Sequence, residues 1–138
     1  MFMYRIILLV MFAFCSCKAD PKALTVSLAK QYNIDEYFML ALFTRESHWD
    51  PKAIGAVGEI GIGQIRCDMH KVKHNISCNR LFDPMYNIRK SFAIFMECYD
   101  QFGNEKDAAR CYNAGASGAR RGRGYTYLND ILKIYIRI

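Results

Sequence analysis

The sequence predicts a mainly α-helical protein with one domain, from its length and from the spacing of its apolar residues. Its 138 residues allow one domain with a modest core. From Asp83-Pro84 to Gly103, apolar residues recur at alternating steps of three and four, which is typical of a buried helix face. The members of this stripe are Met85, Ile88, Phe92, Phe95, Tyr99 and Phe102. No run of alternating apolar and polar residues indicates a sheet.

Capping residues mark the helices before this long one. Asp20-Pro21 places an N-cap and a first-turn proline at the start of a helix that runs to about Tyr32. Asp35 caps a second helix. Asp50-Pro51 is expected to end it, because the residue before a proline is pushed out of the helical region.

The segment between the second helix and the long helix is expected to be mostly irregular. Four glycines lie between Ala53 and Gly63, and they suit a turn or a close approach of the backbone. Residues 62–66 are expected to form one short helical turn, and residues 67–80 a polar surface loop.

Two more helices are expected after the long one. Gly103 is its C-cap, and Asn104 caps a short helix over 105–114 that Gly115 ends. Residues 116–124 then form a flexible basic loop. A last helix starts at about Thr126, and the residues expected on its inward side are Leu128, Ile131, Ile134 or Tyr135, and Ile138.

The first residues have the pattern of a secretory signal peptide. One positive charge, Arg5, precedes an apolar run from Ile6 to Phe14 that is too short to span a membrane comfortably. Cleavage after Ala19 assigns residues 1–19 to the signal and residues 20–138 to the mature domain. Lipid attachment at Cys17 and an uncleaved anchor are the alternatives. The sequence therefore predicts an exported protein.

The charge balance is mildly basic. Removal of the signal peptide leaves 17 basic and 13 acidic side chains, a net charge of +4. This charge suits an anionic polymer as partner, whereas nucleic acid is not expected for an exported chain.

The mature region contains four cysteines, an even number that indicates two disulfides in an oxidising compartment. Three pairings are possible. Cys67–Cys78 and Cys98–Cys111 are preferred because each joins neighbours across a short connection, and each would contribute roughly 2–4 kcal/mol.

Zinc is the competing interpretation of one cysteine pair. Cys67, His70, His74 and Cys78 carry ligand atoms, with the two histidines four residues apart. Export argues against a metal, and the spacing matches no common zinc motif. No metal is therefore predicted.

One acidic residue lies on the apolar face of the second helix. Met39, Leu42, Phe43 and Glu46 fall at helical spacing on a single face. Burial of a carboxyl group raises its pKa, because desolvation disfavours the charged form. A raised pKa suits a general acid that works near neutral pH. The competing interpretation is a frayed helix end that leaves Glu46 in water.

Four short segments resemble the lytic transglycosylase (SLT) domain family, whose fold is lysozyme-like. They are Glu46-Ser47, Gly61-Ile62-Gly63-Gln64, Tyr112-Asn113-Ala114-Gly115 and Tyr127-Leu128. Two flanking segments agree with the family's pattern, namely Asp50-Pro51-Lys52-Ala53, and Leu81-Phe82-Asp83-Pro84 with Asn87-Ile88. The resemblance covers about residues 24–136.

The resemblance implies a role for each matching residue. Glu46 matches the family's only catalytic carboxylate, and Ser47 is expected to orient the sugar or the acid. Gln64 matches a glutamine in the wall of the substrate groove.

The later motifs supply the rest of the implied site. Tyr112 is expected near the acid, Asn113 against the substrate, and Tyr127 close to Glu46. In two places the sequence departs from the family. Gly63 replaces a methionine that packs against sugar, which predicts one looser subsite, and Arg66-Cys67 replaces a Met-Pro or similar pair.

The implied reaction is cleavage of the β-1,4 bond between N-acetylmuramic acid and N-acetylglucosamine in peptidoglycan, with closure of a 1,6-anhydro ring. Glu46 acts as acid and then as base, without a cofactor. Ordinary glycosidases need a second carboxylate. Asp50 and Glu59 are the nearest candidates, and neither has a supporting context in the sequence.

Other functions and partners are also considered. The alternatives are a lysozyme-like muramidase of the same fold and a non-catalytic glycan-binding module. The resemblance implies a periplasmic monomer that binds peptidoglycan glycan strands and serves an envelope-spanning secretion or conjugation machine. The basic residues Arg120, Arg121 and Arg123 either bind carboxylates of the peptide stems or are simply solvated.

Overall fold

The computed structural model describes residues 18–138. The signal peptide and the alternative lipid site at Cys17 therefore fall almost entirely outside the described residues. Within the described part, no helix is long and apolar enough to cross a membrane.

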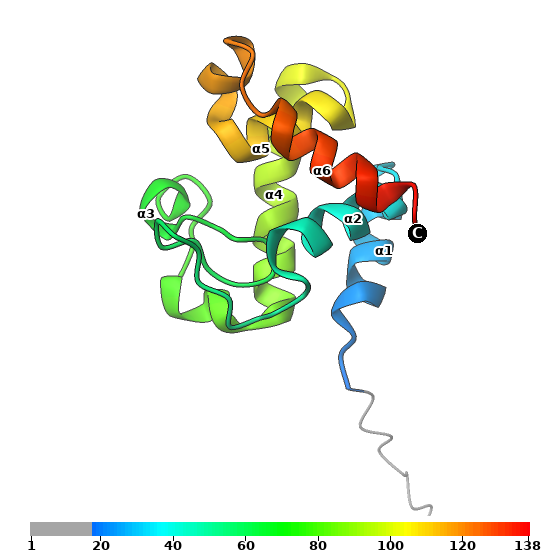
Figure 1. Ribbon diagram of the computed structural model, residues 1–138. Helices are drawn as coiled ribbons and strands as arrows, with labels where there is room; N and C mark the ends of the chain where they lie inside the picture. Colours follow the sequence, from blue (N-terminus) through cyan, green and yellow to red (C-terminus); the bar gives the residue numbers. More distant parts are fainter. Residues whose placement is uncertain (1–17) are drawn as a thin grey trace, which may run out of the picture.

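The described chain is helical, as predicted. The β structure within it is limited to isolated bridges. Its helices are α1 (Pro21–Tyr32), α2 (Glu36–Ser47), α3 (Cys67–His70), η1 (Cys78–Phe82), α4 (Pro84–Phe102), α5 (Glu105–Arg120) and α6 (Tyr125–Tyr135). α4 runs through the middle of the domain, and the segment that carries α3 lies on the opposite side of it from α1 (Figure 1). α4 packs against α1 and α5, and α2 packs against α1 and α6.

Side-chain caps begin the helices as the sequence predicts. The carboxylate of Asp20 accepts a hydrogen bond from the Lys22 N–H, and that of Asp35 accepts from Tyr37 and Phe38. Asp83 caps α4 in the same way, and Gly103 ends that helix at φ 77°. From Ile88 to Phe102 the predicted stripe of α4 packs into the core, and Ile88, Phe92 and Phe95 are fully buried. Met85, its first member, is half-buried and lies outside the core cluster.

The predicted end of α2 at Asp50-Pro51 is wrong, because the helix ends at Ser47. His48 and Trp49 both have left-handed backbone conformations, at φ 52° and 66°. The His48 N–H donates to the Thr44 carbonyl, and the Trp49 indole donates to the Thr44 hydroxyl at 2.9 Å. The left-handed conformation of these two residues ends α2 before the proline is reached.

Gly115 interrupts α5 but does not end it. At φ 73° and ψ 160° it breaks the helical geometry, yet residues 116–120 are helical, so the predicted flexible loop is wrong there. The buried Arg110 side chain explains the order of this turn. Its guanidinium donates to the carbonyls of Ala119 at 2.5 Å and Arg123 at 3.0 Å.

α6 buries Leu128 and Ile131 as predicted. Ile138 is 57% exposed, and its predicted inward position is wrong because the helix ends at Tyr135, before the chain reaches it.

The middle segment is more ordered than the sequence indicates. The predicted helical turn over residues 62–66 does not form. Ile65 instead forms a β-bridge with Ile60, which also bridges to Ile54. The predicted irregular loop 67–80 contains α3 and the first turn of η1, and the Cys67–Cys78 disulfide joins these two short helices.

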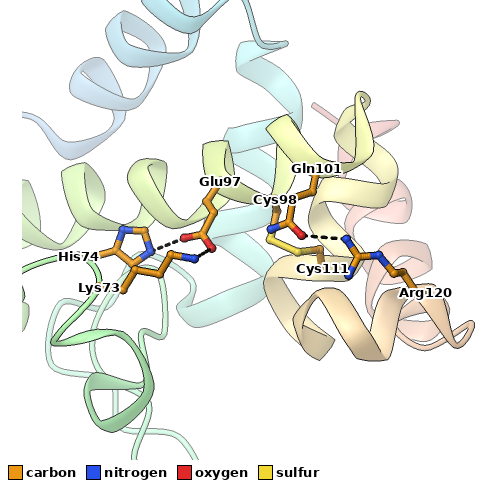
Figure 2. The surroundings of a disulfide bond; sticks show 7 residues. All are labelled: Lys73, His74, Glu97, Cys98, Gln101, Cys111 and Arg120. Carbon is orange, nitrogen blue, oxygen red and sulfur yellow. Dashed lines mark hydrogen bonds and ion pairs between the residues drawn. A yellow bond between two sulfur atoms is a disulfide. The ribbon is translucent and has the colours of Figure 1, made fainter.

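The structure contains both preferred disulfides, Cys67–Cys78 and Cys98–Cys111, each with Cα atoms 5.7 Å apart. Figure 2 shows the second of them linking α4 to α5. The zinc interpretation is wrong, because the first disulfide uses both sulfur atoms that zinc would require. His74 instead lies 2.7 Å from the carboxylate of Glu97 on α4 (Figure 2).

Asn87 on α4 fastens the glycine-rich segment to the core. Its fully buried amide donates to the carbonyls of Ile60 and Leu81, each at 2.9 Å, and accepts from the Gly63 N–H at 2.8 Å. Gly61, at φ 75°, permits this approach, since a Cβ there would lie 2.4 Å from the Asn87 amide nitrogen. One side chain thus satisfies three backbone groups.

We expect Asn87→Ala to lower the free energy of unfolding by about 2–4 kcal/mol, because it leaves these buried backbone groups without partners. Urea unfolding measures the change, with Asn79→Ala, at an exposed position, as the matched control. Equal unfolding midpoints for the two variants would contradict this role of Asn87.

Candidate active site

A cavity of about 560 Å³ lies between the end of α2, the glycine-rich segment, α3, α4 and α5. We call it the groove. Its polar lining includes Arg45, Glu46, Glu59, Gln64, Arg66, Tyr112 and Asn113. The lining therefore contains residues from three of the four predicted motif segments, namely Glu46, Gln64, Tyr112 and Asn113. Ser47 and the fourth segment, Tyr127-Leu128, are not part of it.

Glu46 lies in the last turn of α2, where the buried residues Met39, Leu42 and Phe43 precede it on the same helix. Its side chain is only 9% exposed. Burial raises the pKa of Glu46 to about 7. A hydrogen bond from Tyr127 and the charge of Arg45 partly oppose this effect. At neutral pH, Glu46 is therefore present in both its protonated and its charged form, and the frayed-end interpretation is wrong.

Two tyrosines surround the acid. The Tyr127 hydroxyl, on α6, donates to the Glu46 carboxylate at 2.5 Å. The Tyr112 hydroxyl, on α5, donates to the Gly63 carbonyl at 2.6 Å. Burial, together with the nearby charge of Glu46, raises the pKa of both tyrosines well above the ordinary value. Both hydroxyls are therefore neutral hydrogen-bond donors at neutral pH.

Ser47 and Gln64 hold the glycine-rich segment. The Ser47 hydroxyl donates to the Ile62 carbonyl at 2.9 Å, which ties the end of α2 to this segment. The Gln64 amide donates to the carbonyls of Gly61 at 3.0 Å and Ala53 at 3.3 Å. Asn113 is exposed at the edge of the groove and has its side chain open to solvent.

Gly63 has a steric reason to be glycine. A Cβ at this position would lie 1.9 Å from the Ser91 hydroxyl and 2.9 Å from the Tyr112 hydroxyl. The space beside residue 63 is therefore filled by protein side chains, and any side chain there would clash with Ser91 and crowd the Tyr112 hydroxyl.

The sequence reasoning missed Arg45 and set Glu59 aside. Arg45 lies 3.9 Å from the Glu46 carboxylate, and Glu59 lines the same groove and raises the pKa of Glu46 by its charge. The position of Arg45 next to Glu46 in the chain was the only sequence signal for it. Asp50, the other candidate acid, is exposed and caps its own turn by accepting from the Lys52 N–H.

The three arginines at 120, 121 and 123 do not line the groove. Arg120 donates to Gln101 at 3.0 Å (Figure 2), and Arg121 donates to Ser117 at 2.8 Å. Among residues 18–138, no group of three or more histidine, cysteine or acidic side chains has the geometry to hold a metal ion.

The chain is similar in sequence to known proteins. The model of the family described as "Transglycosylase SLT domain" matches residues 24–134. A transglycosylase of Enterobacteria phage PRD1 is 27% identical over 104 residues, which are 75% of this chain and 38% of that protein. The soluble lytic murein transglycosylase of Escherichia coli K12 is 30% identical over 104 residues, 70% of this chain and 16% of that protein.

Solved structures agree with the fold. An inactive mutant of the lytic transglycosylase Slt from Pseudomonas aeruginosa matches with a TM-score of 0.63 and 26% identity, over 72% of this chain and 17% of that chain. The 70 kDa soluble lytic transglycosylase of Escherichia coli matches with a TM-score of 0.60 and 27% identity. The match covers 81% of this chain and 19% of that chain. The chain thus spans well under half the length of these relatives.

The bond from Tyr127 to Glu46 has a measurable effect on the acid. The hydrogen bond from Tyr127 stabilises the charged form of Glu46. We therefore expect Tyr127→Phe, which removes this bond, to raise the pKa of Glu46 further above its value of about 7. Carbon NMR of labelled glutamate carboxyl groups, titrated with pH, measures this change. Tyr37→Phe, at an exposed position, is the control. A pKa of Glu46 that stays the same or falls would contradict the assignment.

Proposed function

The chain belongs to the transglycosylase SLT domain family, and from this we propose that it is a peptidoglycan lytic transglycosylase with Glu46 as its catalytic residue. The observation that carries the proposal is a single buried acid, with a pKa of about 7, that faces a groove and accepts a hydrogen bond from Tyr127. The relatives that bear the name lytic murein transglycosylase support the choice of substrate.

In the first step, protonated Glu46 gives its proton to the glycosidic oxygen between N-acetylmuramic acid and N-acetylglucosamine. The bond from that oxygen to C1 of the muramoyl residue breaks, and positive charge develops on the sugar ring. The substrate's own N-acetyl oxygen stabilises this charge. Glu46 is left as a carboxylate, which the Tyr127 hydroxyl and the Arg45 guanidinium stabilise.

In the second step, the Glu46 carboxylate takes the proton of the C6 hydroxyl of the same muramoyl residue. O6 forms a bond to C1, and a 1,6-anhydro ring closes. Glu46 ends the reaction protonated, as it began. No water molecule is consumed, so the mechanism needs no carboxylate to activate water.

One observation favours a second candidate, a lysozyme-like muramidase. Glu59 lines the same groove as Glu46, and two carboxylates are what a hydrolase of glycosidic bonds requires. The Glu59 carboxylate is, however, already bound to its own turn, because it accepts a hydrogen bond from the Val57 N–H at 3.0 Å. We therefore assign it an electrostatic effect on Glu46. A non-catalytic glycan-binding module is the third candidate.

We also infer the place of action. Residues 1–19 are proposed to direct export, and residues 20–138 to form the enzyme domain in the periplasm, where two disulfides are stable. From the family resemblance we also propose that the protein acts as a monomer and opens the cell wall for an envelope-spanning secretion or conjugation machine.

We expect Glu46→Gln to reduce the release of glycan fragments from purified sacculi by about 1,000-fold, because the amide cannot donate or accept the transferred proton. Glu36→Gln is the matched control, since Glu36 begins the same helix but lies outside the groove. Full activity of Glu46→Gln would contradict the proposal, and inactivity of the wild type would favour the binding module.

The pKa of Glu46 predicts the pH dependence of kcat/KM. The first step needs the protonated acid, which is lost as pH rises through about 7. We therefore expect kcat/KM to fall by about tenfold for each pH unit above this value. Initial rates on soluble glycan strands between pH 5 and 9 measure the profile. A rate that keeps rising to pH 9 would be incompatible with Glu46 as the acid.

A further inference from the structure

The groove contains two arginines whose hydrogen bonding differs. Arg66 donates from Nε at 3.2 Å and from Nη2 at 2.6 Å to the carboxylate of Asp68. Arg45 lies 3.6 Å from the Asp130 carboxylate and 3.9 Å from that of Glu46, and both distances are too long for hydrogen bonds. Within the described residues, the Arg45 guanidinium has ion-pair contacts but no side-chain hydrogen bond, whereas that of Arg66 is already bound to a carboxylate.

Arg45 is nevertheless held in a defined position. Its guanidinium carbon lies 4.6 Å from the centre of the Tyr127 ring, which is a favourable cation–π distance. The carboxylate of Asp130 on α6 attracts Nη2 of the guanidinium, and that of Glu46 attracts Nη1. The side chain is 34% exposed and lines the groove. A fixed guanidinium with open donors is a ready site for a carboxylate, which it binds in two-pronged geometry.

We propose that Arg45 binds a carboxylate that the substrate carries beside the cleaved bond, and so makes the groove selective for acidic muramoyl glycans over neutral glycans. This inference rests on the proposed function, because it assigns the substrate of the same groove. Arg45 replaces the exposed arginines at 120, 121 and 123 as the cation that meets the peptide-bearing sugar, since those three lie outside the groove lining.

Contact with Arg45 would place the muramoyl residue directly at the acid. Arg45 and Glu46 are adjacent in the chain and lie in the same turn of α2. A carboxylate held by Arg45 therefore fixes the glycosidic oxygen within reach of Glu46. The first step needs the protonated form of Glu46, and in that form Glu46 does not repel the incoming anion.

Two carboxylates of peptidoglycan have this chemistry. One is the lactyl carboxylate of a muramoyl residue without a peptide, and the other belongs to the peptide stem. Three synthetic tetrasaccharides of alternating N-acetylglucosamine and N-acetylmuramic acid separate them. The first has free lactyl groups, the second carries L-alanyl-D-glutamate on each lactyl group, and the third has neutral lactyl methylamides.

The experiment measures the dissociation constants of the three ligands by calorimetry. The protein is the Glu46→Gln variant, which does not consume the ligand, alone and with Arg45→Met, Arg45→Lys or Arg66→Met added. We expect Arg45→Met to weaken binding of one or both acidic ligands by about tenfold, as for a charge-assisted hydrogen bond, and binding of the neutral ligand by less than twofold. Arg45→Lys keeps the charge but loses the planar fork, and should give an intermediate loss. Arg66→Met should not discriminate between the ligands.

The outcomes are distinct. A selective loss for the lactyl ligand assigns Arg45 to that group, and a selective loss for the dipeptide ligand assigns it to the stem. The inference would be overturned if Arg45→Met weakened binding of all three ligands equally, or if the parent variant bound all three with equal affinity. Either result would leave the proposed function intact. Failure of the parent variant to bind any of them would overturn the proposed function and the inference with it.

Discussion

The site depends on one hydrogen bond, from the Tyr127 hydroxyl to the Glu46 carboxylate. It joins two residues that are 81 positions apart in the chain, and so requires that α2 and α6 pack correctly. Burial alone would make Glu46 a weak acid that holds its proton too tightly to cycle. The hydroxyl and the Arg45 guanidinium stabilise the charged form enough to keep the pKa of Glu46 at about 7. A residue that must give and then accept one proton needs this balance.

The opposite wall of the groove is fixed by bonds to backbone groups. Asn87, Ser47 and Tyr112 each bind the segment between Ile60 and Gly63 from a different helix. Two disulfides extend this anchoring, since Cys67–Cys78 closes the segment that carries α3 and Cys98–Cys111 joins α4 to α5. The glycine-rich segment is thus a rigid wall, although its composition resembles that of a flexible loop.

The sequence was sufficient for most helices, because caps and apolar stripes are local signals. It also predicted that Glu46 lies on the buried face of α2, because the apolar stripe of that helix leads to it. Asp20, Asp35 and Asp83 predicted three helix starts correctly. The end of α2 was predicted wrongly because His48 and Trp49 adopt left-handed conformations before the proline is reached. The turn after Gly115 was predicted wrongly because it depends on Arg110, whose side chain binds the Ala119 and Arg123 carbonyls farther along the chain. Arg45 was missed for a similar reason. Its position is set by Tyr127 and Asp130, and no local pattern shows that α6 lies beside it.

The central claim is that one residue, Glu46, completes the reaction without water. Digestion of purified sacculi in water labelled with a heavy oxygen isotope, followed by mass spectrometry of the muramoyl products, tests it directly. The account predicts products that end in 1,6-anhydromuramic acid, lighter by one water than the hydrolysis product and free of the label. Products that end in reducing muramic acid with the label at C1 would contradict it, and would make Glu59 the first candidate for the residue that activates water.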